Sequence, residues 1–135
     1  MRRRNWFSKF IAGRCRSLIR KHENLDYNFD TNGERWLLKK LSTLNFTTIF
    51  DVGGNVGDYS TMLREYFPGS ELHIFEIMPD NRALIEEKMK GVKDVSINDF
   101  GLSNEDSTVK VKYYGEGSGL SSLHDFPHNE ESNWV

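Results

Sequence analysis

Cysteine and proline are scarce in this chain of 135 residues, which has one cysteine and three prolines. The single cysteine, Cys15, excludes an internal disulfide framework and a thiolate zinc site, and it fits a reducing, cytoplasmic compartment. Apolar residues are interrupted too often for a transmembrane span or a signal-peptide core. With 37% hydrophobic and 28% charged residues, the composition is that of one modest globular domain.

Histidine offers no convincing metal site either. His124 and His128 have the i, i+4 spacing of a helical metal pair, but Pro127 breaks the helix that such a pair needs. His22 and His73 stand apart from them in the sequence. We therefore expect no bound metal.

Acidic residues are missing from the first 22 positions. Eight of the 18 basic residues lie between Met1 and His22, and none of the 20 acidic ones does. Apolar residues recur here at three- and four-residue steps, which predicts an amphipathic helix with a cationic opposite face. They are Trp6, Phe7, Phe10, Ile11, Cys15, Leu18 and Ile19.

Three roles remain open for this basic segment. The helix can dock its apolar stripe on the rest of the protein, with its arginines in solvent. It can instead lie on an anionic membrane surface through residues 1–22, or contact nucleic acid. Docking is favoured, peripheral membrane contact comes second, and nucleic acid is least favoured.

Residues 33–44 are expected to form a second helix, with Thr31 or Asn32 as its N-cap. We expect Trp36 in the core rather than at a ligand. The apolar face of this helix is formed by Trp36, Leu37, Lys40, Leu41 and Leu44. Residues 1–44 thus precede the main domain as basic and amphipathic helices.

A short apolar strand that runs into a glycine-rich turn is the most informative feature that is present. The strand is expected over residues 48–52, the turn follows from Gly53 to Gly57, and a helical pattern covers residues 59–67. This order is typical of α/β proteins that bind a nucleotide-like ligand at the carboxyl end of a strand. Glycine lets the backbone turn sharply and approach such a ligand.

The spacing of the glycines disfavours a dinucleotide. A G-x-G-x-x-G register from Gly53 would need glycine at Asn55 and at Asp58. Asp51 instead places a carboxylate at the mouth of the loop, where it repels a pyrophosphate and suits a cation. S-adenosylmethionine has an α-amino group, a sulfonium and no phosphate, so it fits this site. A tight turn without a ligand is the alternative.

A second strand is expected over residues 71–76 and a helix over residues 82–90. In a right-handed βαβ unit the ends of neighbouring strands lie side by side, so Glu76 would stand near Asp51. Glu76 could then accept hydrogen bonds from the ribose hydroxyls, and Ile77 could lie against the adenine. A solvated strand-end acid is the alternative for Glu76.

A third strand is expected over residues 94–100. Asn98 and Asp99 at its end could bond the adenine amino group, and Gly101 would permit close approach of the cofactor. Ordinary strand-end polarity is the alternative for both side chains. Beyond it, period-two alternation predicts a half-exposed strand over residues 108–114. A glycine- and serine-rich loop, either a lid or a linker, and a polar, frayed tail follow.

These segments resemble the FkbM family of S-adenosylmethionine-dependent methyltransferases. The resemblance covers residues 45–123 and rests on residues 50–60, 74–76, 101–104 and 121–123. Asn55 in place of a central glycine is a trait of the family, which usually has alanine at position 54 and proline at position 77. The resemblance implies a class I methyltransferase domain, an α/β fold with a Rossmann-like doubly wound sheet. The expected cofactor-binding residues are Asp51, Gly53, Gly54, Asn55, Gly57, Glu76, Ile77, Asn98, Asp99 and Gly101.

The resemblance further implies O-methylation of a sugar, a glycan or a small metabolite, with no catalytic residue assigned. FkbM-like domains continue into strands that are missing here, so we expect a sheet truncated after the third strand and a following β segment, with residues 124–135 as a polar tail. Strand order three-two-one then leaves Ile49 and Val52 on an unpaired edge. Either a partner chain completes the sheet, or the chain is a non-catalytic remnant that acts as an interaction or membrane-surface module.

Overall fold

The computed structural model describes residues 6–22, 28–113 and 133–134. Within the chain, residues 1–43 and residues 44–135 form two compact units. The first unit contains α1 (Trp6–His22) and α2 (Glu34–Leu41). The predicted amphipathic helix is confirmed by α1, whose described side chains are all exposed. No helix among the described residues is both long enough and apolar enough to cross a bilayer.

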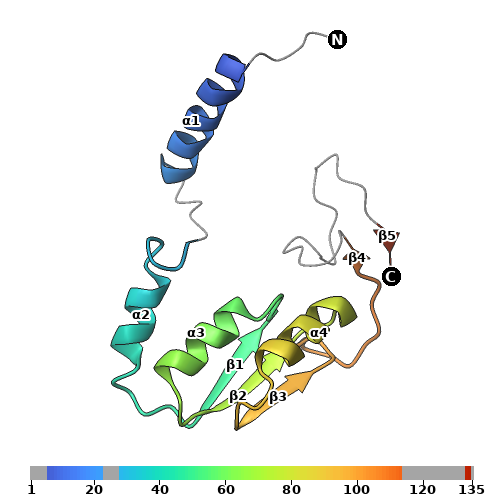
Figure 1. Cartoon of the computed structure of the whole chain (residues 1–135). Coiled ribbons are helices and arrows are strands. Elements are labelled where there is room, and N and C mark those ends of the chain that lie inside the picture. The colour runs from blue at the N-terminus through green and yellow to red at the C-terminus, as the bar shows by residue number, and fades with distance from the viewer. Residues whose placement is uncertain (1–5, 23–27, 114–132, 135) are drawn as a thin grey trace. The chain divides into compact units, whose positions relative to one another are not determined.

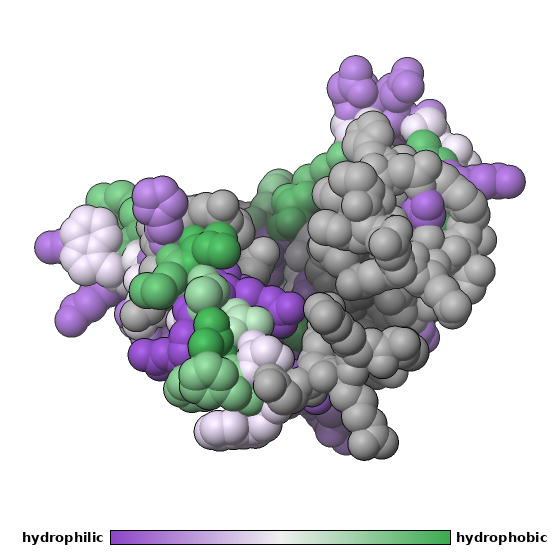
Figure 2. Space-filling model, turned by 90° about the horizontal axis from the view of Figure 1, so that it is seen from above, coloured by the Kyte–Doolittle hydropathy of each residue, from purple (hydrophilic) through white to green (hydrophobic). Residues whose placement is uncertain are grey.

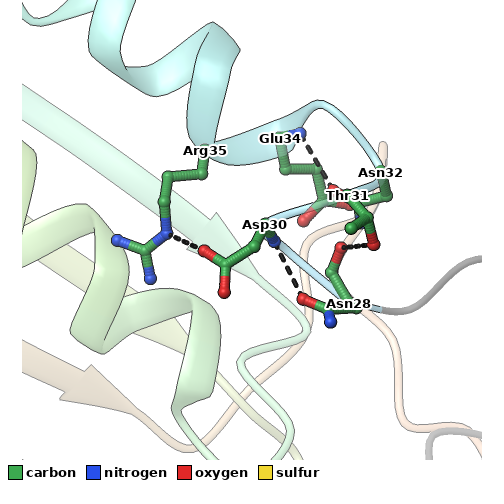
Figure 3. Close-up of polar contacts among 6 residues, drawn as sticks. All are labelled: Asn28, Asp30, Thr31, Asn32, Glu34 and Arg35. Atoms are coloured by element: carbon green, nitrogen blue, oxygen red, sulfur yellow. Dashed lines mark hydrogen bonds and ion pairs between the residues drawn. The ribbon is translucent and has the colours of Figure 1, made fainter.

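A polar turn leads into α2 (Figure 3). Asn28 Oδ1 accepts a hydrogen bond from the Asp30 amide at 3.0 Å, and Arg35 Nε lies 2.7 Å from the Asp30 carboxylate. The predicted N-cap is wrong, because Gly33 occupies that position with a φ of 91° that favours glycine. Asn32 nevertheless satisfies one backbone amide of the first turn, since its Oδ1 accepts a hydrogen bond from the Glu34 amide at 2.9 Å.

The apolar face predicted for α2 is also wrong. Leu38, which does not belong to that predicted face, is the buried side chain of the helix, whereas Trp36 is 65% exposed. Positions two apart on a helix are about 200° apart, so a helix that buries Leu38 turns Trp36 outward. The Trp36 ring packs instead against a neighbouring cation, with Lys40 Nζ 5.8 Å from its centre.

The second unit is built on a parallel sheet of three strands. These strands are β1 (Thr48–Val52), β2 (Glu71–Phe75) and β3 (Val95–Asn98), in the spatial order β1-β2-β3. Helix α3 (Asp58–Tyr66) connects the first two strands, and α4 (Pro79–Lys88) connects the second pair. The predicted α/β class and strand order are therefore confirmed, and the arrangement is compatible with a Rossmann-like fold.

One face of the sheet is covered by helices. Figure 1 shows α3 and α4 on the same side of the three strands. Leu72 and Ile74 alternate along β2, point to that side and are fully buried together with Ile85 of α4. Met62 and Leu63 of α3 are buried as well. The core of this unit thus lies between the helices and one face of the sheet.

The opposite face of the sheet carries a row of aromatic rings. Phe50 on β1 meets His73 and Phe75 on β2 edge to face at 5.3 and 5.5 Å, and Phe75 meets Phe100 at 5.6 Å. Phe50 is 60% exposed and Val52 is exposed beside it. Among the described strands β1 pairs with β2 alone, so the expected open edge is present. Figure 2 shows apolar side chains at the surface among hydrophilic ones.

The strand predicted over residues 108–114 is much shorter in the structure. Among its described residues only Lys112–Tyr113 form a strand, β4, which pairs antiparallel with β5 (Asn133–Trp134). Val111 is buried but Val109 is exposed, although a spacing of two places both on the same face of a strand, so the predicted alternation of exposure does not extend to residue 109. A strand also needs a neighbouring strand with which to form backbone hydrogen bonds, and residues 108–111 have no described strand beside them. The prediction of a frayed tail is wrong at residues 133–134, and residues 114–132 lie outside the described part.

Candidate cofactor site

The loop between β1 and α3 turns through left-handed backbone. Gly53 and Gly57 have φ values of 83° and 80°, a region in which glycine is nearly free of strain. Asn55 has a φ of 48°, and asparagine is one of the few other residues that adopt this conformation routinely. The amides of Gly53 and Gly54 both donate to the Phe75 carbonyl, at 2.8 and 3.1 Å, so β2 holds the start of the loop.

Gly54 serves packing rather than backbone freedom. A Cβ at this position would lie 2.5 Å from Ile74 Cγ2 and 3.3 Å from Ile85 Cδ1. Both neighbours are fully buried, so neither has room to move away. The absence of a side chain at Gly54 therefore lets the loop lie directly on β2 and α4.

Glu76 links the loop to the end of β2. Its Oε2 accepts a hydrogen bond from the Asn55 amide, and its Oε1 accepts from the Met78 amide, both at 2.8 Å. The backbone amide of Glu76 donates to the Asn98 carbonyl at 3.1 Å. These bonds fix one orientation of a carboxylate that is 7% exposed. Each oxygen keeps a further acceptor site, so the carboxylate could still bind hydroxyl groups of a ligand.

Asp51 lies one residue before the end of β1 and is buried. Its Oδ2 accepts a hydrogen bond from the hydroxyl of Ser60 in α3. Burial raises the pKa of Asp51 above the ordinary value of 3.8, the Ser60 hydrogen bond opposes that rise, and the nearby Glu76 charge adds to it. The structure therefore places Asp51 inside the loop, against α3.

Neither buried carboxylate forms an ion pair with a residue that the structure describes. Arg35 pairs with Asp30 and Lys88 with Asp58, and His73 Nε2 lies 3.3 Å from Glu71 Oε1. Asp51 and Glu76 take part in none of them. Two buried acids at adjacent strand ends, neither in an ion pair with a described residue, contribute negative potential there, which favours a positively charged ligand.

The other candidates lie at the ends of β2 and β3. Ile77 follows Glu76, and its Cγ2 lies 3.5 Å from where a Cβ on Gly101 would be, so these two residues are neighbours. Asn98 donates from Nδ2 to the Ile74 carbonyl at 3.1 Å, which uses its side chain to hold β3 to β2. Asp99 is exposed, and within the described part of the chain no hydrogen bond or ion pair joins its side chain to the other candidates.

Three further residues shape this site, although the sequence analysis assigned them no role. Ser60 is fully buried and bonds Asp51. Asn81, 3% exposed in the first turn of α4, donates from Nδ2 to Asn55 Oδ1 at 3.1 Å. Arg82 Nη1 donates to the carbonyls of Glu76 and Ile77 at 3.2 and 2.9 Å. Their one signal in the sequence is a polar residue in the first turn of a helix that follows a strand.

Comparison with known proteins points to methyl transfer. Over 78 residues, 56% of this chain, the sequence is 28% identical to Methyltransferase 1 of Beauveria bassiana (strain ARSEF 2860). The match covers 31% of that protein, so the chain spans about a third of the length of the curated relative that it matches. No family model matches the chain. The similarity is thus to a methyltransferase in general and does not single out the FkbM family.

Proposed function

We propose that this chain binds S-adenosylmethionine in the loop between β1 and α3 and supports transfer of its methyl group. The observation that carries the proposal is the pair of buried carboxylates, Asp51 and Glu76, at the carboxyl ends of adjacent parallel strands. S-adenosylmethionine offers two positive centres and a ribose diol, which complement unneutralised carboxylates. The similarity to a methyltransferase supports the same choice of ligand.

The roles of the two acids differ. Glu76 is held by two backbone amides, and its remaining acceptor sites suit the two ribose hydroxyls. Asp51 supplies negative charge beneath the loop and attracts the cationic part of the ligand. Gly53, Gly54 and Gly57 carry no side chains, so the ligand could approach the backbone of the loop closely. Ile77 and Gly101 would border the adenine.

Methyl transfer asks little acid or base chemistry of the protein. The sulfonium is a strong electrophile, and alignment of donor with acceptor supplies much of the rate. We propose an oxygen nucleophile as the acceptor, on a sugar, a glycan or a small metabolite. This choice follows the FkbM resemblance, and no catalytic residue is assigned.

Calorimetric titration of the full chain with S-adenosylmethionine and with S-adenosylhomocysteine tests the proposal. We expect saturable binding of both ligands, weakened by roughly tenfold or more in Glu76→Gln, because the amide replaces one acceptor by a donor. Glu71→Gln is the matched control, since it changes an exposed acid at the other end of the same strand. Circular dichroism establishes that each variant is folded.

Absence of heat with either ligand at high protein concentration would refute the proposal. It would favour the alternative, a non-catalytic chain. Equal affinities of the two Glu→Gln variants would show that ligand binds elsewhere. For the acceptor, transfer of a labelled methyl group to a panel of sugars, glycans and small hydroxylated metabolites is the direct measurement. Labelling of amines alone would contradict the oxygen nucleophile.

A further inference from the structure

Helix α1 combines exposed apolar side chains with positive charge. Each of its described side chains is exposed, including large ones such as Trp6 at 78% and Leu18 at 68%. The rings of Trp6 and Phe10 stack at 5.9 Å with an interplanar angle of 20°. Isolated exposed apolar residues are ordinary, but a helix that carries this many needs a partner to cover them.

Three apolar and three cationic side chains lie on opposite faces of the helix. Phe7, Ile11 and Leu18 follow one another at four- and seven-residue steps, which places them on one face. Lys9, Arg16 and Arg20 keep the same kind of spacing from a start two residues later. Two residues correspond to a rotation of about 200°, so the three cations lie on the opposite face.

Acidic residues are absent from this helix, so its charge is uncompensated along its own length. The 17 residues of α1 include no Asp or Glu. Arg14, one heptad after Phe7, lies on the apolar side, where its long stem lets the guanidinium reach outward to the bilayer surface. A helix of 17 residues is about 26 Å long. It is suited to lie in the plane of an interface, and it does not meet the requirements for a span.

We propose that α1 anchors this protein peripherally to membrane surfaces that are rich in anionic lipid. The apolar face enters the boundary between headgroups and acyl chains, and the cations face lipid phosphates and carboxylates. Trp6 and Phe10 occupy the headgroup level, where aromatic rings are enriched. This proposal is independent of cofactor binding.

Among partners outside this chain, charge and apolarity together favour a bilayer over nucleic acid or a second copy of α1. Nucleic acid would neutralise the cations but would leave Phe7, Ile11 and Leu18 in water. A second copy of α1 would cover the apolar face, but it brings the same positive charges and no acid to complement them. An anionic bilayer satisfies both faces at once.

Vesicle flotation with the full chain tests the proposal. The vesicles are phosphatidylcholine alone, or phosphatidylcholine with about one third phosphatidylserine. We expect the wild-type chain to partition at least about 100-fold more strongly onto the anionic vesicles, by roughly the electrostatic contribution of three cations. Raising the salt concentration should reduce that preference.

Two triple variants separate the contributions of the faces. Lys9→Gln/Arg16→Gln/Arg20→Gln should weaken binding to anionic vesicles by about 100-fold, since each cation near the surface contributes about fivefold. Its matched control, Lys39→Gln/Lys93→Gln/Lys110→Gln, removes three exposed cations outside α1 and should bind nearly as the wild type does. Phe7→Ser/Ile11→Ser/Leu18→Ser should lose roughly tenfold or more on anionic vesicles.

All these substitutions are at exposed positions, so folding is expected to persist, and circular dichroism checks it. A wild-type chain that fails to float, or that floats equally with both kinds of vesicle, would overturn the proposal. Binding that both triple variants retain would do the same. Two parallel measurements cover the other occupants. One is fluorescence anisotropy with labelled duplex DNA, and the other is self-association measured by light scattering. If the α1 variants change DNA binding or self-association while vesicle binding is absent, the proposal is overturned.

Discussion

Replacing Gly54 with alanine isolates the contact that holds the cofactor loop on β2. The new methyl group would lie 2.5 Å from Ile74 Cγ2, well inside van der Waals contact, and 3.3 Å from Ile85 Cδ1. Both side chains are fully buried, so relief requires the loop to lift or the core to shift. Overpacking of this kind costs about 1–3 kcal/mol of unfolding free energy. Gly54 lacks a positive φ, so backbone strain adds nothing.

Gly53 provides a comparison with a different cause of destabilisation. A Cβ there would meet no atom within 4 Å, but its φ of 83° strains any residue with a side chain. We expect Gly53→Ala to cost about 1–2 kcal/mol. Asparagine tolerates left-handed backbone, so Gly53→Asn should be milder than Gly53→Ala. At Gly54 the order should reverse, because a larger side chain increases the overlap.

Urea unfolding followed by tryptophan fluorescence and circular dichroism measures these costs. With an m value of about 2 kcal/mol per molar urea, Gly54→Ala should lower the midpoint by about 0.5–1.5 M. Ile74→Ala removes Cγ2, so Gly54→Ala should cost much less in that background. Trimethylamine N-oxide added to all samples keeps the weakened variants folded. An unchanged midpoint for Gly54→Ala would refute the reasoning, and so would a cost that Ile74→Ala leaves undiminished.

Three further predictions concern single polar groups. Asp51→Asn should stabilise the fold more at neutral pH than near pH 3. The folded-state pKa of Asp51 is raised, so the stability of the wild type falls as the pH rises from the unfolded-state pKa through the folded-state pKa. Melting temperatures at both pH values check this, and a pH-independent difference would contradict it. Arg64→Lys should lower the free energy of unfolding in urea by about 2 kcal/mol. The guanidinium donates to the carbonyls of Phe67, Pro68, Ser70 and Asp94 at 2.8–3.3 Å, and an ammonium group cannot reach all four. A midpoint equal to that of the wild type would count against this. Asn81→Ala should weaken the binding of S-adenosylhomocysteine roughly tenfold and should weaken the binding of its 2′-deoxy analogue less, because Asn81 positions Asn55 beside Glu76. An equal loss of affinity for both ligands would mean that Asn81 has a purely structural role.

The elements that sequence patterns predicted best are those with a strong local signal. Apolar runs bounded by glycine and proline located β1, β2 and β3, and the expectation of half a doubly wound sheet gave their order. Boundaries moved by a few residues; α4, for example, begins at Pro79 rather than at residue 82. Proline fits the first turn of a helix because it has no amide hydrogen to leave unpaired.

Errors arose where tertiary context decides. Trp36 has the largest side chain of its helix, yet Leu38 is the buried residue. The sequence pattern of eight residues is compatible with burial of either face. Residues 108–111 alternate as a strand should, but pairing depends on a neighbour that no local pattern specifies. Both mistakes concern relations between elements.

The contacts that organise the candidate site were out of reach for the same reason. Ser60 and Asp51 are nine residues apart, and Asn81 and Asn55 are 26 apart. Such pairs depend on the register of the sheet and on individual rotamers. Sequence reasoning could nominate Asp51 and Glu76 as strand-end acids, but it could not assign Glu76 to the amides of Asn55 and Met78.

Several costly features of this fold gather around one loop. The left-handed Asn55, the buried Asp51 with its raised pKa and the nearby Glu76 charge all lie where β1 and β2 end. Each lowers the stability of the fold at this end of the sheet. Local rules are broken most often at sites that bind or react, because a ligand can relieve what the empty fold must tolerate. A cation bound beside Asp51 would favour its ionised form, so the feature that weakens the fold is the one that would strengthen the complex.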